Sequence, residues 1–303
     1  MDLSVIILNY NSSDYLKKCL DSINNSDIGK YQYEIIVVDN CSTDNSIELA
    51  KKIKNTNIKF LELKTNKGFA HGNNQGVKEI NNKTKFVLFL NPDTVVEKDT
   101  FKKMIEFFEK NKDVDAATCK IDLALTGKMQ PECHRGFPTP WNSLCHFSGL
   151  SKIFPKSKIF SGYLLGHLNK NIIHKIDACV GAFLMVKKDV GDKIKWWNEK
   201  YFFYGEDIDF CYQLKQNKFN LYFNPECKIT HFQGVSSGLI NKSKHLSSAS
   251  RETKILTAKA STEAMRIIYK ENLFSNYSFP IKFLVMFGIK ILELKRVFKA
   301  KYL

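Results

Sequence analysis

The sequence predicts an α/β fold, with a mostly parallel sheet flanked by helices. Two observations support this fold. Four continuous apolar segments have strand character, and each is followed by a polar loop and then by a segment that reads as a helix. This order of elements is typical of parallel strands that are covered by helices on both faces of the sheet. The 303 residues are enough for one large domain or two modest ones.

The first 110 residues contain these four units in series. The predicted strands are residues 3–8, 33–38, 58–63 and 86–90. The helices that follow them are predicted for residues 15–23, from about 45, 68–80, and about 98–110. The polar run 39–44 precedes the second helix and can cap it.

Polar side chains gather where these strands end. Asn9 and Asn11 follow the first strand, Asp39 the second, the group Asn66, Lys67 and Gly68 the third, and Asp93 the fourth. Each of them alone could be ordinary loop or capping chemistry, and Asp44 could either line a pocket or only cap its helix. Together they predict a ligand site, because ligands bind at the carboxyl ends of parallel strands.

Glycines recur every four residues in the third helix, at Gly68, Gly72 and Gly76. This spacing lines one face of a helix and favours close packing of the helix over the cradling of a phosphate. No G-x-G-x-x-G motif follows any of the strands, which argues against a plain dinucleotide-binding fold.

The periodicity weakens beyond residue 113. Residues 115–122 could be another strand, residues 126–175 are irregular and carry no assignment, and residues 176–186 are predicted as a buried strand. Acidic residues Glu206, Asp207 and Asp209 then open a helix that runs to about residue 216. One acidic residue at the start of a helix can be explained by capping. Three acidic residues in four positions beside an aromatic cluster are more than capping requires.

The net charge of +15 is distributed unevenly. Residues 1–100 are neutral, residues 101–238 carry +6, and residues 239–303 carry +9, so the tail is expected to meet an anionic partner. Only four of the 46 basic residues are arginine, which disfavours a sequence-specific reader of nucleic acid. Eight cysteines without metal-ligand spacing are expected to be reduced, mostly buried thiols of a cytoplasmic protein, and the N-terminus lacks signal-peptide features.

The tail, residues 279–303, has apolar residues at helical spacing with lysines between them. Its longest uncharged run, 283–289, is far shorter than the roughly 20 residues that span a bilayer. An amphipathic helix on an anionic membrane surface is therefore expected. The alternative is a helix that packs on the rest of the protein or on a second subunit.

The motifs, taken together and in order, resemble those of a bacterial family 2 glycosyltransferase, and most closely those of the rhamnosyltransferase-like branch. They are Ser4–Asn11, Val37–Asp44, Asn66–Ala70, Leu90–Asp93, Gly181–Phe183, Phe203–Asp209 and Thr230-His231. The resemblance implies a GT-A (Rossmann-like) fold, a nucleotide-sugar donor and inversion at the anomeric carbon. It also implies a catalytic domain at 1–240, with a donor half at 1–112 and an acceptor half at 113–240, followed by a basic helical extension at 241–303.

The resemblance also assigns roles to residues. Asp93 and His231 would bind a divalent metal, Mg²⁺ or Mn²⁺, with the donor diphosphate supplying further ligands. Asn91 stands where many relatives have a first carboxylate and would hydrogen-bond the donor. The remaining donor-site residues would be Asn9, Asn11, Asp39, Asn66, Lys67 and Gly68. Asp39 would accept the imide hydrogen of uracil or thymine, which cytosine lacks.

Inverting transfer needs a base that takes the proton of the acceptor hydroxyl. Asp207 is expected to be this base, with Glu206 orienting the acceptor and Asp209 serving a structural role. The predicted reaction transfers a sugar, L-rhamnose from dTDP-L-rhamnose, to a glycan or undecaprenyl-linked acceptor during cell-surface polysaccharide or lipopolysaccharide synthesis. It would take place on the inner face of the cytoplasmic membrane.

Three other activities are alternatives to this one. A UDP-sugar donor (galactofuranose, GlcNAc or another hexose) is the first alternative. A sugar-nucleotide pyrophosphorylase would need a glycine-rich, arginine-containing loop after the first strand, and residues 9–13 offer neither. A basic nucleic-acid-binding protein is a distant alternative, and no nucleic-acid partner is expected.

Overall fold

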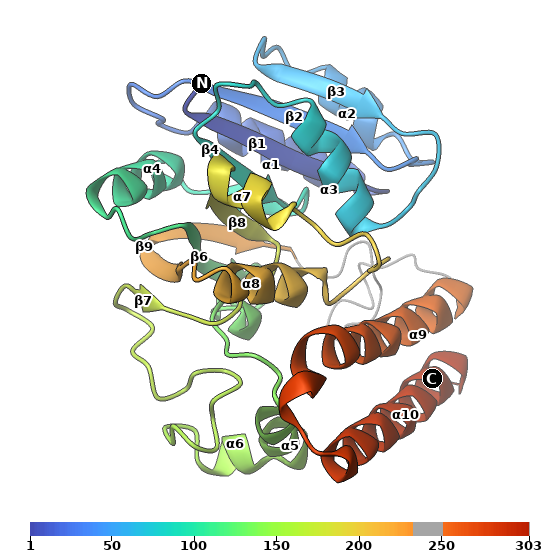
Figure 1. The fold of residues 1–303 in the computed structure, drawn as a ribbon. Helices are drawn as coiled ribbons and strands as arrows, with labels where there is room; N and C mark the ends of the chain where they lie inside the picture. Colours follow the sequence, from blue (N-terminus) through green and yellow to red (C-terminus); the bar gives the residue numbers. More distant parts are fainter. Residues whose placement is uncertain (233–250, 303) are drawn as a thin grey trace.

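The computed structural model of the chain describes residues 1–232 and 251–302, and it has the predicted α/β architecture (Figure 1). Nine strands in this part of the chain form one sheet, in the order β3-β2-β1-β4-β8-β6-β9-β5, and β7 pairs with β9. The strands are β1 Leu3–Asn9, β2 Tyr33–Asp39, β3 Ile58–Glu62, β4 Phe86–Leu90, β5 Thr94–Val96, β6 Ala116–Leu123, β7 His174–Lys175, β8 Phe183–Lys187 and β9 Leu221–His231.

The first four strand–helix units form the parallel part of the sheet, as predicted. β1 lies between β2 and β4, and β2 pairs with β3, with all three pairs parallel. The connecting helices are α1 Asp14–Asn24, α2 Ser46–Lys51, α3 Phe69–Lys78 and α4 Thr100–Lys110. Residues of β1, β2 and β4 are almost completely buried, which explains their continuous apolar sequences. The core also takes in seven of the eight cysteines, all of which are free thiols.

The glycines of α3 allow that helix to pack closely on the sheet. A Cβ atom at Gly72 would lie 2.3 Å from Leu8 Cδ1, and one at Gly76 would lie 2.6 Å from Ile6 Cγ2 and 3.0 Å from Val38 Cγ2. All three distances are below ordinary van der Waals contact. The close-packing interpretation is therefore confirmed for Gly72 and Gly76, whereas Gly68 precedes α3 and a Cβ there would meet the backbone of Phe202.

We expect Gly76→Ala to lower the free energy of unfolding by about 1–2 kcal/mol. Overpacking costs about 1–3 kcal/mol, and the better helix propensity of alanine offsets up to about 1 kcal/mol of it. Gly288, within α10 (Phe279–Tyr302), is the matched control, because a Cβ there meets nothing within 4 Å. Gly288→Ala should leave stability unchanged or raise it by up to about 1 kcal/mol. Urea denaturation measures both variants, and equal effects would contradict the packing argument.

The second half of the sheet is mixed. β8 runs antiparallel to both β4 and β6, while β6 and β9 are parallel. β6 confirms the strand suggested for residues 115–122. The unassigned stretch 126–175 contains η1 Pro131–Cys133, α5 Pro140–Ser148, α6 Leu150–Ile153 and the short strand β7.

The strand predicted for residues 176–186 is wrong in its first seven residues. β8 begins only at Phe183. Ala178 pairs instead with Arg135 in an isolated antiparallel bridge, and Ile176 N–H donates to the carbonyl of Leu221 at 3.0 Å. These residues are apolar because the segment is buried outside the regular sheet. α7, Lys188–Ile194, which was not predicted, follows β8 directly.

Two helices end the described chain, α9 Arg251–Ile268 and α10 Phe279–Tyr302, and they lie side by side in Figure 1. Ile289 of α10 is buried against α9, and Arg266 of α9 forms an ion pair with Glu293 of α10. The opposite face of α10 leaves a row of apolar side chains exposed. None of the described helices is both long and apolar enough to cross a membrane. The expected boundary at residue 240 lies outside the described residues.

Candidate active site

The ends of β1 and β2 carry the first cluster of predicted site residues. Asn9 and Asp39 are paired in the parallel register, and both side chains are buried. Asn9 Nδ2 donates to Asp39 Oδ1 at 2.7 Å and to Ser46 Oγ at 2.9 Å. Asp39 also accepts the backbone N–H of Ser42 at 2.9 Å and the Ser42 hydroxyl at 2.6 Å. A carboxylate has about four acceptor positions, so Asp39 retains about one for a ligand.

Asn11 and Asp44 hold the two adjacent loops together. The backbone N–H of Asn11 donates to Ser42 Oγ, and Asn11 Oδ1 accepts the N–H of Thr43 at 2.8 Å. Asp44 accepts the backbone N–H of Ser13 at 2.7 Å and that of Ser46, the first residue of α2, at 3.2 Å. Asp44 therefore caps α2 and ties it to the loop after β1.

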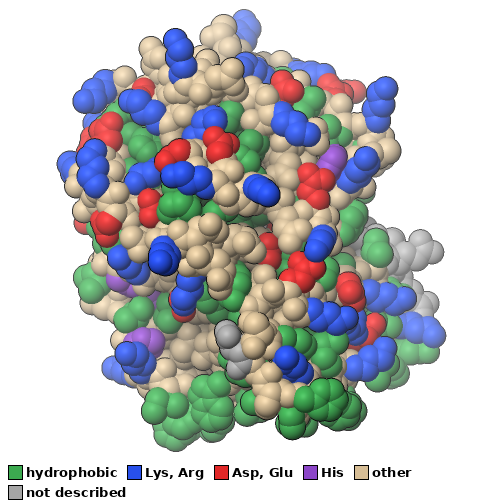
Figure 2. Space-filling view, viewed as in Figure 1, with side chains coloured by type: hydrophobic (Ala, Val, Ile, Leu, Met, Phe, Trp, Pro, Cys, Tyr) green, Lys and Arg blue, Asp and Glu red, His purple; other side chains and the backbone are tan. Residues whose placement is uncertain are grey.

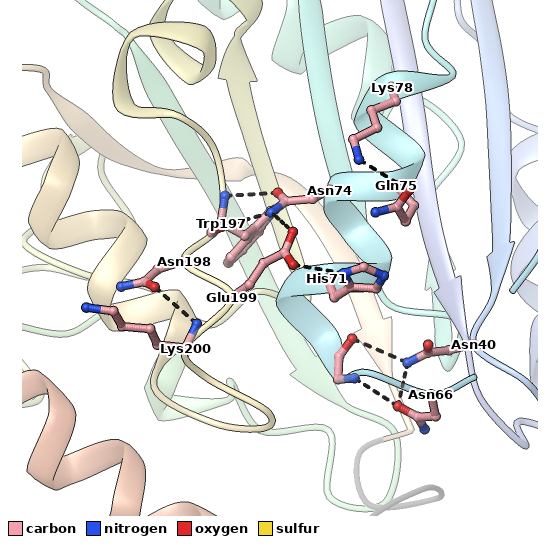
Figure 3. Close-up of polar contacts among 11 residues, drawn as sticks. Asn40, Asn66, His71, Asn74, Gln75, Lys78, Trp197, Asn198, Glu199 and Lys200 are labelled. Atoms are coloured by element: carbon pink, nitrogen blue, oxygen red, sulfur yellow. Dashed lines mark hydrogen bonds and ion pairs between the residues drawn. The ribbon is translucent and has the colours of Figure 1, made fainter. Parts of the chain in front are cut away.

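The third loop joins this edge through Asn40, which the sequence analysis did not single out. Asn40 Nδ2 donates to Asn66 Oδ1 at 2.8 Å and to the carbonyl of Gly68 at 3.3 Å (Figure 3). Asn66 Oδ1 also accepts the N–H of Gly68 at 2.9 Å. Asn40 Oδ1 is buried and has no hydrogen-bond partner in the part of the chain that the structure describes. Lys67, which lies between Asn66 and Gly68 in the sequence, is exposed.

The residues that precede the acidic group Glu206, Asp207 and Asp209 contact α3 and its start. The N–H of Phe69 donates to the carbonyl of Phe202 at 3.0 Å, directly beside Gly68 with its φ of +96°. Further along α3, Glu199 accepts from Asn74 Nδ2 and contacts His71 Nδ1, each at 2.8 Å (Figure 3). These contacts fix the segment that leads into α8, Glu206–Gln216, against the first half of the chain.

Asp93 and His231 come together across the β5–β9 pairing. The register pairs Thr94 with His231, and Asp93 Oδ1 lies 3.1 Å from His231 Nε2. The other ring nitrogen, Nδ1, lies 2.8 Å from Oε1 of the buried Gln130. All three side chains are buried. Gln233-Gly234, which extend this motif in the sequence, lie outside the described residues.

This pair fits a divalent cation. When Nδ1–H of His231 donates to Gln130 Oε1, Nε2 carries no hydrogen and its lone pair faces an oxygen of Asp93. Two acceptor atoms that face each other in this way require a proton or a cation between them. Mg²⁺ and Mn²⁺ accept one carboxylate and one imidazole when substrate oxygens and water complete the shell. Among the described residues, no group of three or more His, Cys, Asp or Glu side chains is arranged to hold a metal.

Asn91 precedes this pair. Its backbone N–H donates to the carbonyl of Ala182 at 3.1 Å, and its own carbonyl accepts the hydroxyl of Thr94 at 2.8 Å. The side chain is half-buried.

The acidic motif begins α8 and meets a buried arginine. Asp207 Oδ2 accepts Arg135 Nη2 at 2.7 Å, and the two side chains are 14% and 7% exposed. The main chain of Arg135 is held by its bridge to Ala178, and Nη2 also reaches the carbonyl of Cys179 at 3.4 Å. A buried guanidinium needs a counter-charge, so this geometry requires Asp207 as a carboxylate.

Glu206 has a different environment from Asp207. It is buried, and residues 1–232 and 251–302 offer its Oε2 no hydrogen-bond partner. Burial, followed by the negative charge of Asp207, raises the pKa of Glu206 to about 8. At neutral pH Glu206 is therefore mostly a neutral acid that can donate a hydrogen bond. Burial alone would lower the pKa of Arg135, but the charge of Asp207 raises it overall.

Asp209 is tied to the C-terminal helices rather than to this pair. Its Oδ1 accepts Tyr201 OH at 3.3 Å and Asn272 Nδ2 at 2.5 Å. Burial raises the pKa of Asp209. Ala264 of α9 lies against Gly205, so that a Cβ at Gly205 would be 2.9 Å from it. These contacts agree with the structural role expected of Asp209.

One short segment connects the two pairs. Gln130 contacts His231, and Arg135, five residues later, contacts Asp207. Five residues span at most about 18 Å, so both pairs belong to one region. Gln130 and Arg135 were not among the predicted site residues, because they lie in the unassigned stretch. One feature of the sequence could have indicated Arg135, since it is the only arginine before residue 251.

Residues 4–172, more than half of the chain, match the family described as glycosyl transferase family 2. The chain belongs to glycosyl transferase family 2. This family 2 chain is 28% identical over 224 residues to the low-salt glycan biosynthesis hexosyltransferase Agl10 of Haloferax volcanii, a match that covers 73% of this chain and 64% of Agl10. It is 27% identical over 237 residues to rhamnosyltransferase WbbL of Escherichia coli, covering 75% and 82%.

A third relative of this family 2 chain is TarS of Staphylococcus aureus, a poly(ribitol-phosphate) β-N-acetylglucosaminyltransferase, which is 35% identical over 112 residues. That match covers 37% of this chain and 19% of TarS. The chain thus spans less than two thirds of the length of Agl10 and of TarS.

Solved structures show the same fold. TarS 1–349 with UDP-GlcNAc aligns with a TM-score of 0.55 at 19% identity, covering 98% of this chain and 82% of that one. GalNAc-T7 with UDP, GalNAc and Mn²⁺ aligns with a TM-score of 0.62 at 15% identity, covering 89% and 48%. The expected GT-A fold is confirmed.

Proposed function

We propose that this family 2 chain is an inverting glycosyltransferase that moves a sugar from a nucleoside diphosphate to a hydroxyl of a glycan or lipid-linked acceptor. One observation carries the proposal. A buried carboxylate–imidazole pair, Asp93–His231, and a buried carboxylate–guanidinium pair, Asp207–Arg135, are joined by the single segment 130–135. The first pair suits a leaving diphosphate, and the second suits proton removal from an acceptor.

In the proposed reaction, the acceptor hydroxyl gives its proton to Asp207 while its oxygen attacks the anomeric carbon. The bond from that carbon to the diphosphate breaks, and the nucleoside diphosphate leaves with the bonding electrons. Attack from the face opposite the leaving group inverts the configuration. Asp207 keeps acceptor capacity, since among the described residues its oxygens take hydrogen bonds only from Arg135 and from the N–H of Ile208.

Asp93 and His231 would hold Mg²⁺ or Mn²⁺ on the donor diphosphate, where the ion supplies positive charge for the developing negative charge. Neutral Glu206 would donate a hydrogen bond to the acceptor and orient it. Asn9 holds Asp39 in position, and Asp39 would accept the imide hydrogen of the base. Asn11, Asn66, Lys67, Gly68 and Asn91 would line the rest of the donor site.

For the donor we propose dTDP-L-rhamnose, in a pathway that builds a cell-surface polysaccharide. The similarity to rhamnosyltransferase WbbL supports this sugar. A UDP-sugar is the second candidate, supported by the fold neighbours whose structures contain UDP or UDP-GlcNAc.

Calorimetric titration with dTDP, UDP and CDP, each with and without Mn²⁺, tests the donor proposal. We expect micromolar, Mn²⁺-dependent binding of dTDP or UDP and no binding of CDP, because cytosine lacks the imide hydrogen that Asp39 would accept. Asp39→Asn should abolish this preference, and Asp14→Asn, at an exposed aspartate of α1, serves as the matched control. Equal binding of CDP would contradict the assignment of Asp39.

We also propose that the protein is peripheral on the inner face of the cytoplasmic membrane. The apolar row of α10 and its lysines support this location, because such a helix binds anionic lipid through both apolar burial and charge. Binding to lipid vesicles tests it directly.

A further inference from the structure

A second group of exposed apolar side chains lies outside the tail, on α5, α6 and the segment after them. Leu144 and Phe147 of α5 are 56% and 60% exposed, and Ile153 of α6 is 67% exposed. Phe154 and Ile159 are exposed as well. Figure 2 shows hydrophobic side chains gathered along the lower edge of the molecule, where Figure 1 places α5, α6 and the start of α10.

The two apolar groups lie at the same end of the fold. Tyr269 OH, in the turn between α9 and α10, donates to the carbonyl of Pro138 at 2.6 Å and lies 3.0 Å from Ser143 Oγ of α5. Of the 20 large hydrophobic side chains exposed in the described residues, 15 belong to residues 141–159 or to α10. Large exposed apolar patches on a protein surface mark interaction sites.

The charge of both groups is basic. No acidic residue occurs between Glu132 and Asp177, whereas Lys152, Lys156 and Lys158 are exposed in that stretch. α10 carries five lysines and one arginine, and its only acid, Glu293, is paired with Arg266 and Lys290. Apolar side chains flanked by an excess of lysines complement a bilayer with anionic head groups.

We propose that α5–α6 and the exposed row of α10 form one docking surface, which binds an anionic lipid bilayer. This inference deepens the membrane attachment proposed above by adding a second contact region from the acceptor half. A second copy of the chain is a poorer occupant, because a two-fold interface would bring the lysines of this surface against one another. The surface starts five residues after Arg135, so a docked bilayer would lie near the Asp207–Arg135 pair.

Flotation with vesicles tests the two-part surface. The wild-type chain should bind vesicles of phosphatidylglycerol and phosphatidylcholine but not vesicles of phosphatidylcholine alone. The triple variant Leu144→Ser, Phe147→Ser, Ile153→Ser should bind at least about tenfold more weakly, as should Phe283→Ser, Leu284→Ser, Phe287→Ser in α10. Ile172→Ser is the matched control at an exposed apolar side chain outside the surface, and it should bind as the wild type does.

Nucleotide binding, measured on the same samples, shows that each variant is folded and separates this test from that of the proposed function. Loss of vesicle binding with intact nucleotide binding supports the surface. Full vesicle binding by the α5–α6 variant would overturn it. Dimerisation of the wild type in sedimentation experiments, abolished by the α5–α6 variant and without vesicle binding, would assign the surface to a second copy instead. A wild-type chain that binds vesicles but no nucleotide would contradict the proposed function alone.

Discussion

Asp207→Asn is expected to reduce the rate of sugar transfer by about 10²–10⁴-fold, which is the usual contribution of a positioned general base. Asparagine has nearly the same shape and can still accept a hydrogen bond from Arg135, but it cannot take up the acceptor proton. Nucleotide affinity should not change, because Asp207 lies on α8, away from the ends of β1 and β2 that carry Asn9 and Asp39. Transfer assays and calorimetry measure the two quantities separately.

Glu206→Gln is the matched control for this prediction. Because the raised pKa of Glu206, about 8, keeps it mostly protonated at neutral pH, glutamine imitates the form already present. We therefore expect transfer by Glu206→Gln to stay within about tenfold of the wild type, as removal of a charge that is already neutralised has little effect on the transition state. If Asp207→Asn were active and Glu206→Gln inactive, Glu206 would be the base and Asp207 the residue that orients the acceptor.

Asp207→Asn leaves Arg135 as a buried charge without its counter-charge, which typically costs about 3–5 kcal/mol of stability. The pair Arg135→Met with Asp207→Asn removes both charges and avoids this penalty. We expect the double variant to be folded, to bind nucleotide, and to lack transfer. Recovery of transfer in the double variant would show that the charge imbalance, not the missing base, inactivated the single variant.

The second large effect is expected from the Asp93–His231 pair. Asp93→Asn, or chelation of divalent metal from the wild type, should lower kcat/KM by about 10²-fold or more, since each 1.36 kcal/mol of lost charge stabilisation corresponds to a factor of ten. Mn²⁺ should restore the chelated wild type but not Asp93→Asn. Mn²⁺-dependent nucleotide binding, measured by calorimetry, should be lost in the same variant.

Gln130→Ala tests whether the Asp93–His231 pair acts through metal binding or through another effect. The side chain of Gln130 contacts the second nitrogen of His231, so its loss should weaken Mn²⁺ affinity by about 10–100-fold while excess Mn²⁺ restores the rate. Asp14→Asn, at an exposed aspartate of α1, is the control that should change neither quantity. Full activity in the presence of a chelator would show that lysine or arginine side chains, rather than a metal, neutralise the leaving group.

The sequence predicts the first half of the fold well because each strand there is buried on both faces and is followed closely by its own helix. The pairs Asn9–Asp39 and Asn40–Asn66 then follow from parallel register, which brings the carboxyl ends of consecutive strands together. This edge of the sheet can therefore be predicted from the pairing of neighbouring strands alone.

The second half depends on contacts that local patterns do not encode. Residues 176–182 are apolar except for Asp177, because most of them are buried, and burial without regular pairing has the same composition as a strand. Arg135 lies 72 positions from Asp207, inside a stretch without periodicity, so nothing local indicated its partner. Asp93 and His231 were found only through the motifs of the family, since their contact depends on the three-residue strand β5.

The pairing of β5 with β9 also sets an order of assembly for this molecule. Asp93 and His231 are separated by 138 positions, whereas Asn9 and Asp39 are separated by 30. Closing the longer loop costs about 1.3 kcal/mol more chain entropy, and it waits for β8 and β6 to extend the sheet. On the ribosome, the edge at Asn9 and Asp39 can thus form while the last third of the chain is still being synthesised. In the proposed mechanism, the acidic and imidazole groups that would act on a bound donor meet only after residue 231 has emerged, so the growing chain would acquire nucleotide recognition before it acquires the chemistry of transfer.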